Sequence, residues 1–224
     1  MKIKALIVTV FLVPGIYLFA QNNDPGRWEE TIVKFEMQDQ IHPPAKGAVL
    51  FTGSSSIAMW QDIEETFPEY EIINRGFGGS EFSDLIYYAD RIIYPYEPSQ
   101  IFIYEGDNDL AAGESIDSIL KEAQELREEI RRKLPNVPVI FISPKPSISR
   151  WELKEDYEKL NKALEDFAAN SELTGFADVW SAMLDEKGEV RKDVFLEDDL
   201  HMNSKGYKIW KTVLMPFMEE RGTK

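Results

Sequence analysis

Short apolar runs alternate with long amphipathic segments along most of this chain, and this alternation limits its fold more than any other feature. The apolar runs have the length and the polar boundaries of buried strands, and they lie at 48–51, 70–73, 101–104, 137–142 and 176–179. The amphipathic segments carry apolar residues every three or four positions, as helices do, at 28–35, 82–89, 116–130, 153–167 and 210–217. Strands separated by helices predict an α/β fold, in which a five-stranded parallel sheet has helices on both faces.

Polar turns that contain glycine follow the first three predicted strands, at 53–56, 74–80 and 106–109. Parallel strands all point the same way, so these turns are expected at one edge of the sheet. Ligands of such folds bind beyond the carboxyl ends of the strands. The sequence therefore predicts a functional site at this edge.

Asp198 and His201 have the spacing of a catalytic acid and base. His201 is one of two histidines in the chain, and in a turn a residue three positions upstream lies on the same face. Asp198 can then hold one imidazole nitrogen and leave the other free as a base. The alternative is that Asp198 merely orients a structural histidine. A nucleophile for this base has to be a hydroxyl, because the chain contains no cysteine, and Ser55 on the first turn is the candidate.

The same turns offer hydrogen-bond donors for a developing oxyanion. Ser55 is expected at the start of a helix, where N–H groups lack partners and the helix dipole favours negative charge. Gly79 can offer a backbone N–H at close range, and Asn108 can donate its side-chain amide without carrying charge. A nucleophile, a base and oxyanion donors at one edge are the parts that acyl transfer requires.

In their order along the chain, these motifs resemble the sequence blocks of the SGNH or GDSL hydrolase family. The segment 53–57 reads Gly-Ser-Ser-Ser-Ile where the family has Gly-Asp-Ser-Leu, so Ser54 replaces the aspartate and Ser55 takes the nucleophile position. Gly79 falls in the second block, the segment 106–109 matches Gly-x-Asn-Asp, and the segment 198–201 matches Asp-x-x-His. The resemblance covers about residues 48 to 207.

The resemblance implies a flavodoxin-like three-layer fold and hydrolysis of esters of lipids, small acids or acetylated sugars. It implies a triad of Ser55, His201 and Asp198 that works through an acyl-enzyme, with no metal and no cofactor. The oxyanion hole would consist of Ser55, Gly79 and Asn108. The short gaps between the motifs leave little material for a large lid, so we expect a small acyl group, such as acetyl on an exported carbohydrate.

Other interpretations stay open at this point. Ser54 and Ser56 are rival nucleophiles or simple helix caps, and the glycines of 76–79 are compatible with turns or with a phosphate cradle. An exported binding protein on the same fold would lack turnover. A metal-dependent phosphatase would instead use an oxygen-rich site made of Asp107, Asp109, Asp198 and Asp199.

Four further residues have no assigned role in the sequence. His42, before two prolines, is expected in a loop, and three residues either line the site or pack in the core: Trp60, Arg75 and Tyr104.

The first twenty residues have the order of a secretory signal: two lysines, an apolar run to Ala20 and then a polar segment. We therefore expect a signal peptide at 1–20, one hydrolase domain at 21–224 and an exported protein with no stable membrane partner after cleavage. An uncleaved N-terminal membrane anchor is the alternative. The net charge of −15 argues against a nucleic-acid partner, which would demand a basic surface. A small-molecule or carbohydrate ester is the expected partner.

Overall fold

The computed structural model describes residues 24–219, so the expected signal peptide at 1–20 lies outside the described residues. The sheet contains five strands: β1 (Val49–Gly53), β2 (Ile72–Gly76), β3 (Gln100–Tyr104), β4 (Val139–Ile142) and β5 (Thr174–Ala177). Every pairing is parallel, and the strand order is β2-β1-β3-β4-β5. The predicted five-stranded parallel sheet is confirmed, and its order is that of the flavodoxin-like fold.

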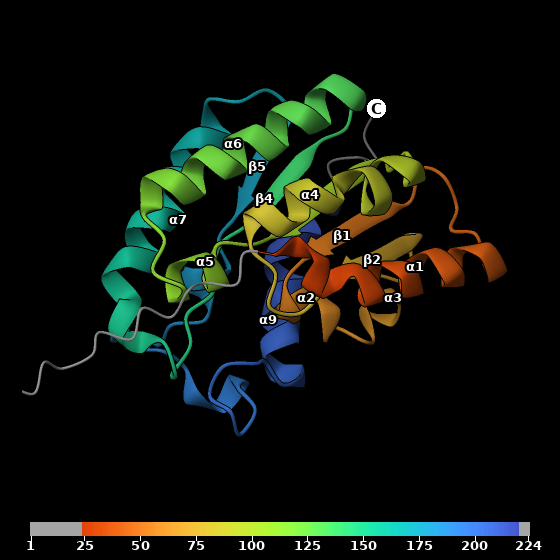
Figure 1. The fold of residues 1–224 in the computed structure, drawn as a ribbon. Helices are drawn as coiled ribbons and strands as arrows, with labels where there is room; N and C mark the ends of the chain where they lie inside the picture. The colour runs from red at the N-terminus through yellow and green to blue at the C-terminus, as the bar shows by residue number, and fades with distance from the viewer. Residues whose placement is uncertain (1–23, 220–224) are drawn as a thin grey trace, which may run out of the picture.

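Helices cover both faces of the sheet and complete the three predicted layers (Figure 1). The core on one face lies under the longer helices α1 (Glu29–Ile41), α4 (Phe82–Ile92), α6 (Ile116–Lys133) and α7 (Lys154–Ala169). The core on the other face lies under α2 (Ser55–Ala58), α3 (Ile63–Thr66), α8 (Val179–Ala182) and α9 (Ser204–Glu219). None of the helices within residues 24–219 combines the length and the apolar character that crossing a membrane would require.

The strands are apolar throughout because the sheet is buried on both faces. In β1, Leu50 belongs to the core on one side, whereas Val49 and Phe51 belong to the core on the other. In β3, Ile103 and Phe102 divide between the two cores in the same way. Successive side chains of a strand point to opposite faces, so a doubly covered strand needs an unbroken apolar run.

Two predicted strand boundaries are wrong, because backbone pairing does not end where the apolar side chains end. Strand β2 continues through Asn74 and Arg75, because their backbones pair with β1 although their side chains are polar. Strand β5 ends at Ala177, since Asp178 caps α8 by accepting the N–H of Ser181 at 2.9 Å. Helices of four or five residues, such as α2 and α5 (Asp107–Ala111), are too short to show a period. Single-turn 3₁₀ helices were not expected either, and they lie at Pro25–Trp28, Tyr94–Tyr96, Trp151–Leu153 and Lys192–Val194.

Candidate active site

The turn between β1 and α2 presents consecutive serines at the carboxyl edge of the sheet. Gly53 ends β1 with a φ of 119°, and a side-chain carbon there would lie 2.1 Å from the carbonyl oxygen of Tyr104. Only glycine fits such a position. The N–H of Ser54 donates to the same carbonyl oxygen at 3.0 Å, and Ser55 is the first residue of α2. The N–H of Ser55 therefore lies in the first helical turn, where N–H groups have no partner within the helix.

His201 lies between Ser55 and Asp198. Its Nε2 is 3.0 Å from Oγ of Ser55, and its Nδ1 is 2.6 Å from Oδ2 of Asp198. An ionised carboxylate can only accept, so Nδ1 carries the proton and Nε2 is left as an acceptor for the serine hydroxyl. The structure thus brings together the three residues that were predicted as a triad.

A hydrogen-bonded loop holds Asp198 and His201 in place. Oδ1 of Asp198 accepts the backbone N–H groups of Leu200 at 3.0 Å and His201 at 2.9 Å. Asp199 has a left-handed backbone with a φ of 57°, and its carbonyl oxygen accepts the N–H of Ile148 at 3.0 Å. The loop is therefore tied both to itself and to the segment that follows β4.

The side chain of Asp198 is 48% exposed, and contact with water favours its charged form. The slight burial that it has would raise its pKa, but hydrogen bonds outweigh this effect. The bonds from the His201 ring and from the backbone N–H groups of His201 and Leu200 lower the pKa of Asp198 to about 2. Asp198 is therefore a carboxylate throughout the neutral range and can stabilise an imidazolium.

The other two predicted donors, Gly79 and Asn108, lie beside the serine turn but meet at Ser54. The N–H of Gly79 donates to Oγ of Ser54 at 3.2 Å, and Nδ2 of Asn108 donates to the same oxygen at 2.7 Å. Nδ2 also donates to the carbonyl oxygen of Ser80 at 2.9 Å. Ser54 is only 1% exposed. Sequence reasoning treated Ser54 as a cap or rival nucleophile and missed this contact, for which the missing aspartate of the block was the available signal.

Trp28 also lies at the site, a residue that the sequence analysis did not connect with it. Its Cη2 atom is 3.3 Å from the position that a side-chain carbon on Gly79 would take. The indole ring packs edge-on against Phe77, with ring centroids 5.8 Å apart. The indole ring of Trp28 therefore lies next to Gly79, one of the predicted oxyanion donors.

The four aspartates of the alternative metal site have separate partners. Asp107 pairs with Arg150 at 2.5 Å, and Asp198 pairs with His201. Asp109 accepts the N–H groups of Phe82 and Gly106, both at 3.0 Å. The carbonyl of Asp199 holds the loop described above. The structure does not gather these four carboxylates into one ligand set.

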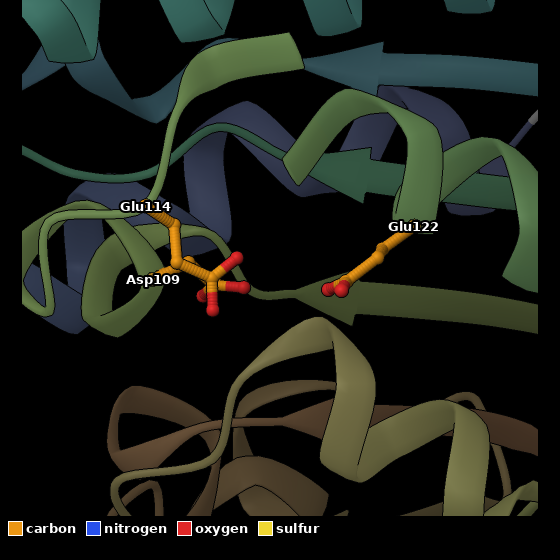
Figure 2. A group of neighbouring side chains, drawn as sticks. All are labelled: Asp109, Glu114 and Glu122. Atoms are coloured by element: carbon orange, nitrogen blue, oxygen red, sulfur yellow. The ribbon is translucent and has the colours of Figure 1, made fainter. Parts of the chain in front are cut away.

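A different group of carboxylates has the spacing of a hard-cation site. Oxygen atoms of Asp109, Glu114 and Glu122 lie within 4.8 Å of one another. Figure 2 shows the carboxylate of Glu122 pointing toward those of the other two residues. Burial, together with Glu81 and Glu114, raises the pKa of Asp109 to about 7. Burial and the neighbouring Glu114 raise the pKa of Glu122 to about 7 as well. Partial protonation at neutral pH therefore limits the negative charge of this cluster.

Of the four residues without an assigned role, three have buried side chains with partners other than Ser55: Trp60, Arg75 and Tyr104. Trp60 is 0% exposed and contacts Trp210 edge-on. Arg75 forms an ion pair with Asp39 of α1. Tyr104 donates from its hydroxyl to Oδ2 of Asp107 at 2.7 Å. His42 is exposed and follows α1, as expected for a loop residue.

The chain matches a known protein-family model over most of its length. The family model described as GDSL-like lipase/acylhydrolase matches residues 51–209. The chain belongs to this family. The assignment confirms the resemblance seen in the sequence, and it makes the GDSL-like protein a carboxylic ester hydrolase. None of the curated proteins compared with it matches the chain.

Solved structures match the fold of this GDSL-like hydrolase over most of its length. A Streptococcus pneumonia protein named for platelet activating factor is 22% identical, with a TM-score of 0.76, and the match covers 86% of this chain and 92% of that one. A GDSL-like lipase from Bacteroides thetaiotaomicron is 18% identical, with a TM-score of 0.72 and coverage of 88% and 98%. An acetyl xylan esterase from Geobacillus stearothermophilus is 15% identical, with a TM-score of 0.63 and coverage of 77% and 95%. At these identities the likeness concerns the fold.

Proposed function

We propose that this GDSL-like hydrolase cleaves esters by a serine mechanism, with Ser55 as nucleophile, His201 as base and Asp198 as its orienting carboxylate. One observation carries the proposal: Oγ of Ser55 lies 3.0 Å from Nε2 of His201, whose other nitrogen is held by Asp198. A nucleophile within hydrogen-bond distance of an oriented base is the geometry that such chemistry requires.

In this mechanism the proton of the Ser55 hydroxyl passes to Nε2 of His201 while Oγ bonds to the acyl carbon. The carbonyl oxygen of the ester becomes an oxyanion. When the tetrahedral intermediate collapses, the bond to the alcohol breaks, and the alcohol oxygen takes the proton from His201. Water then attacks the acyl-enzyme by the same proton transfers, which releases the acid and restores Ser55. Asp198 stabilises the imidazolium in both steps.

The oxyanion would accept from the N–H groups of Ser55 and Gly79 and from Nδ2 of Asn108. The contacts of Gly79 and Asn108 with Ser54 support this assignment, since both donors already point to one place beside Ser55. Both hydrogens of Nδ2 are already donated, to Ser54 and to Ser80, so the oxyanion would replace or share the Ser54 hydroxyl as an acceptor.

We propose a small acyl group, such as acetyl, carried by a carbohydrate or a related exported substrate. Trp28 beside Gly79 supports a narrow acyl pocket, because a ring there takes up space that a long acyl chain would need. One structural relative is an acetyl xylan esterase, which shares the fold and suggests which esters to test. Export is a further proposal, and it depends on the signal-like residues 1–20.

Active-site labelling tests the proposal directly. A fluorophosphonate probe followed by peptide mass mapping should label Ser55, and Ser55→Ala should abolish labelling and lower kcat by at least about 10³-fold. Ser56→Ala is the matched control, because Ser56 is buried in the same turn and should leave labelling in place. A label on Ser54 or Ser56, or hydrolysis that disappears with chelator and returns with a divalent ion, would overturn the mechanism.

A series of nitrophenyl esters tests the substrate. Turnover should be highest for acetate and should fall with each longer chain. A preference for acyl chains of eight or more carbons would contradict the small-acyl proposal and leave the serine mechanism untouched.

A further inference from the structure

The side chain of Arg150 joins the carboxamide of Asn108 to the buried carboxylate of Asp107. Nη2 of Arg150 donates to Oδ1 of Asn108 at 3.1 Å. Nη1 donates to Oδ1 of Asp107 at 2.5 Å and to its carbonyl oxygen at 3.0 Å. Arg150 comes from the segment after β4, far from Asn108 in the sequence, so the contact depends on the fold.

The hydrogen bonds at the two ends of the Asn108 carboxamide favour the same orientation. At one end Nδ2 donates to the hydroxyl of Ser54 and to the carbonyl oxygen of Ser80. At the other end Oδ1 accepts from the guanidinium of Arg150, which can only donate. A flipped carboxamide would place its N–H groups against a cation and its oxygen against the Ser80 carbonyl oxygen. Arg150 therefore keeps the N–H groups of Asn108 turned toward the serine turn.

Arg150 is itself held by a carboxylate that stays ionised. Asp107 is buried and accepts from the hydroxyl of Tyr104 at 2.7 Å and from that of Tyr157. Lys145 lies 3.5 Å from the same carboxylate and is 1% exposed. Burial would raise the pKa of Asp107, but Lys145, Arg150 and the two tyrosines together lower it to about 2. The anchor of Arg150 is therefore charged throughout the neutral range.

We propose that Arg150 is a positioning residue, which fixes the carboxamide of Asn108 so that the N–H that donates to Ser54 can face the oxyanion. This inference rests on the proposed function, because it assigns a role within the same reaction. Arg150 acts through Asn108 and does not contact the ester. It should therefore influence kcat much more than KM, since the oxyanion exists only after the serine has attacked.

The test is a double-mutant cycle between Arg150 and Asn108, with kcat and KM measured on an acetyl ester. Arg150→Ala should lower kcat about 10-fold to 100-fold, a part of what a whole oxyanion donor contributes, while KM changes less than about threefold. In an Asn108→Ala background the same change should lower kcat less than about threefold, because the group that Arg150 positions is gone. Arg150→Lys should recover part of kcat, since a lysine can still donate to Oδ1.

Arg131→Ala is the control for the loss of an arginine, because Arg131 is half exposed and pairs with Glu172 on the surface. If Arg150→Ala fails to fold because it leaves Asp107 without its partner, the smaller loss of kcat in Arg150→Lys is used instead, and this loss should disappear in the Asn108→Ala background. Equal losses of kcat in both backgrounds, or a rise in KM alone, would show that Arg150 acts by another route. If fluorophosphonate does not label Ser55 in the wild-type protein, the serine mechanism is rejected, and this inference is rejected with it.

Discussion

The carboxylate of Asp109 accepts the backbone N–H of Phe82, the first residue of α4, at 3.0 Å. Its other oxygen accepts the N–H of Gly106, the residue before α5, at 3.0 Å. One buried side chain therefore joins the turn after β2 to the turn after β3. Glu114 and Glu122 lie close to the same carboxylate, so the connection between the two turns lies in an acidic environment.

The protein should lose stability as the pH rises toward the raised pKa of Glu122. The folded-state pKa of Glu122 is raised to about 7 from an ordinary value of 4.5. The folded protein thus holds a proton that the unfolded chain releases, and the stability is fully present below about pH 4.5 and lost on approach to pH 7. Glu122→Gln should therefore stabilise the protein at pH 8 by on the order of 1 kcal/mol, allowing for the partial exposure of the side chain.

Chemical denaturation from pH 4.5 to 8 measures this change, with Glu128→Gln on the exposed side of the same helix as control. A Glu122→Gln curve parallel to the wild-type curve over this range would disprove the coupling.

Replacing Asp198 by asparagine should be more harmful than replacing it by alanine. An asparagine amide can donate to Nδ1 of His201, which would move the ring proton to Nε2 and block the acceptor that faces Ser55. We expect Asp198→Asn to lower kcat by at least about 10²-fold and Asp198→Ala to retain more activity. Steady-state kinetics of both variants on one acetyl ester decide this, and the reverse order would argue against the assigned tautomer.

Removing the amide of Asn108 should cost transition-state stabilisation and leave the fold intact. The loss of one oxyanion donor typically lowers turnover by about 10²–10³-fold, or about 3 kcal/mol. Asn108→Ala should show this loss in kcat, with an unfolding midpoint close to that of the wild type. An unchanged kcat would remove Asn108 from the reaction.

Ser54 should act as an acceptor that keeps both donors in place. Ser54→Ala removes an oxygen that accepts from Gly79 and Asn108, and the loss of about 1 kcal/mol of hydrogen bonding corresponds to about a fivefold fall in kcat. Ser54→Asp restores the acceptor and should exceed the alanine variant in kcat. If alanine and aspartate give the same kcat, the hydroxyl of Ser54 has no part in the arrangement.

Trp28 should limit the length of the acyl group. Trp28→Ala removes the ring beside Gly79, so the ratio of kcat/KM for a butyryl ester over an acetyl ester should rise at least about fivefold, as for pocket changes of this size. Tyr87→Ala is the control, because Tyr87 is an exposed aromatic residue on α4. An unchanged ratio would place the acyl group elsewhere.

The sheet could be predicted because both of its faces are covered. A doubly buried strand needs an unbroken apolar run, and that run is visible in the sequence without knowledge of its partners. The ends of β2 and β5 could not be predicted from the sequence in this way. Asn74 and Arg75 pair through their backbones, and backbone pairing leaves no mark in side-chain polarity.

Some residues of the candidate site could be predicted from the sequence, and others could not. Ser55, Asp198 and His201 carry motifs with fixed local spacing, and the structure brings them together. Arg150 and Trp28 reach the site from segments with no motif of their own, so only the folded chain reveals their contacts with Asn108 and Gly79. Ser54 is intermediate, because its departure from the family motif was visible while its hydrogen-bond partners were not.

The helix α1 and the turn before it lie outside the matched residues 51–209, yet they bring Trp28 to the rim of the site. Ion pairs attach this N-terminal segment to α4, between Arg27 and Asp84 at 2.7 Å and between Arg91 and Glu36 at 2.6 Å. The segment adds no strand to the sheet and no member of the proposed triad. With the role proposed for Trp28, we expect that grafting the corresponding segment of a relative onto this chain changes the substrate preference and leaves the serine chemistry in place.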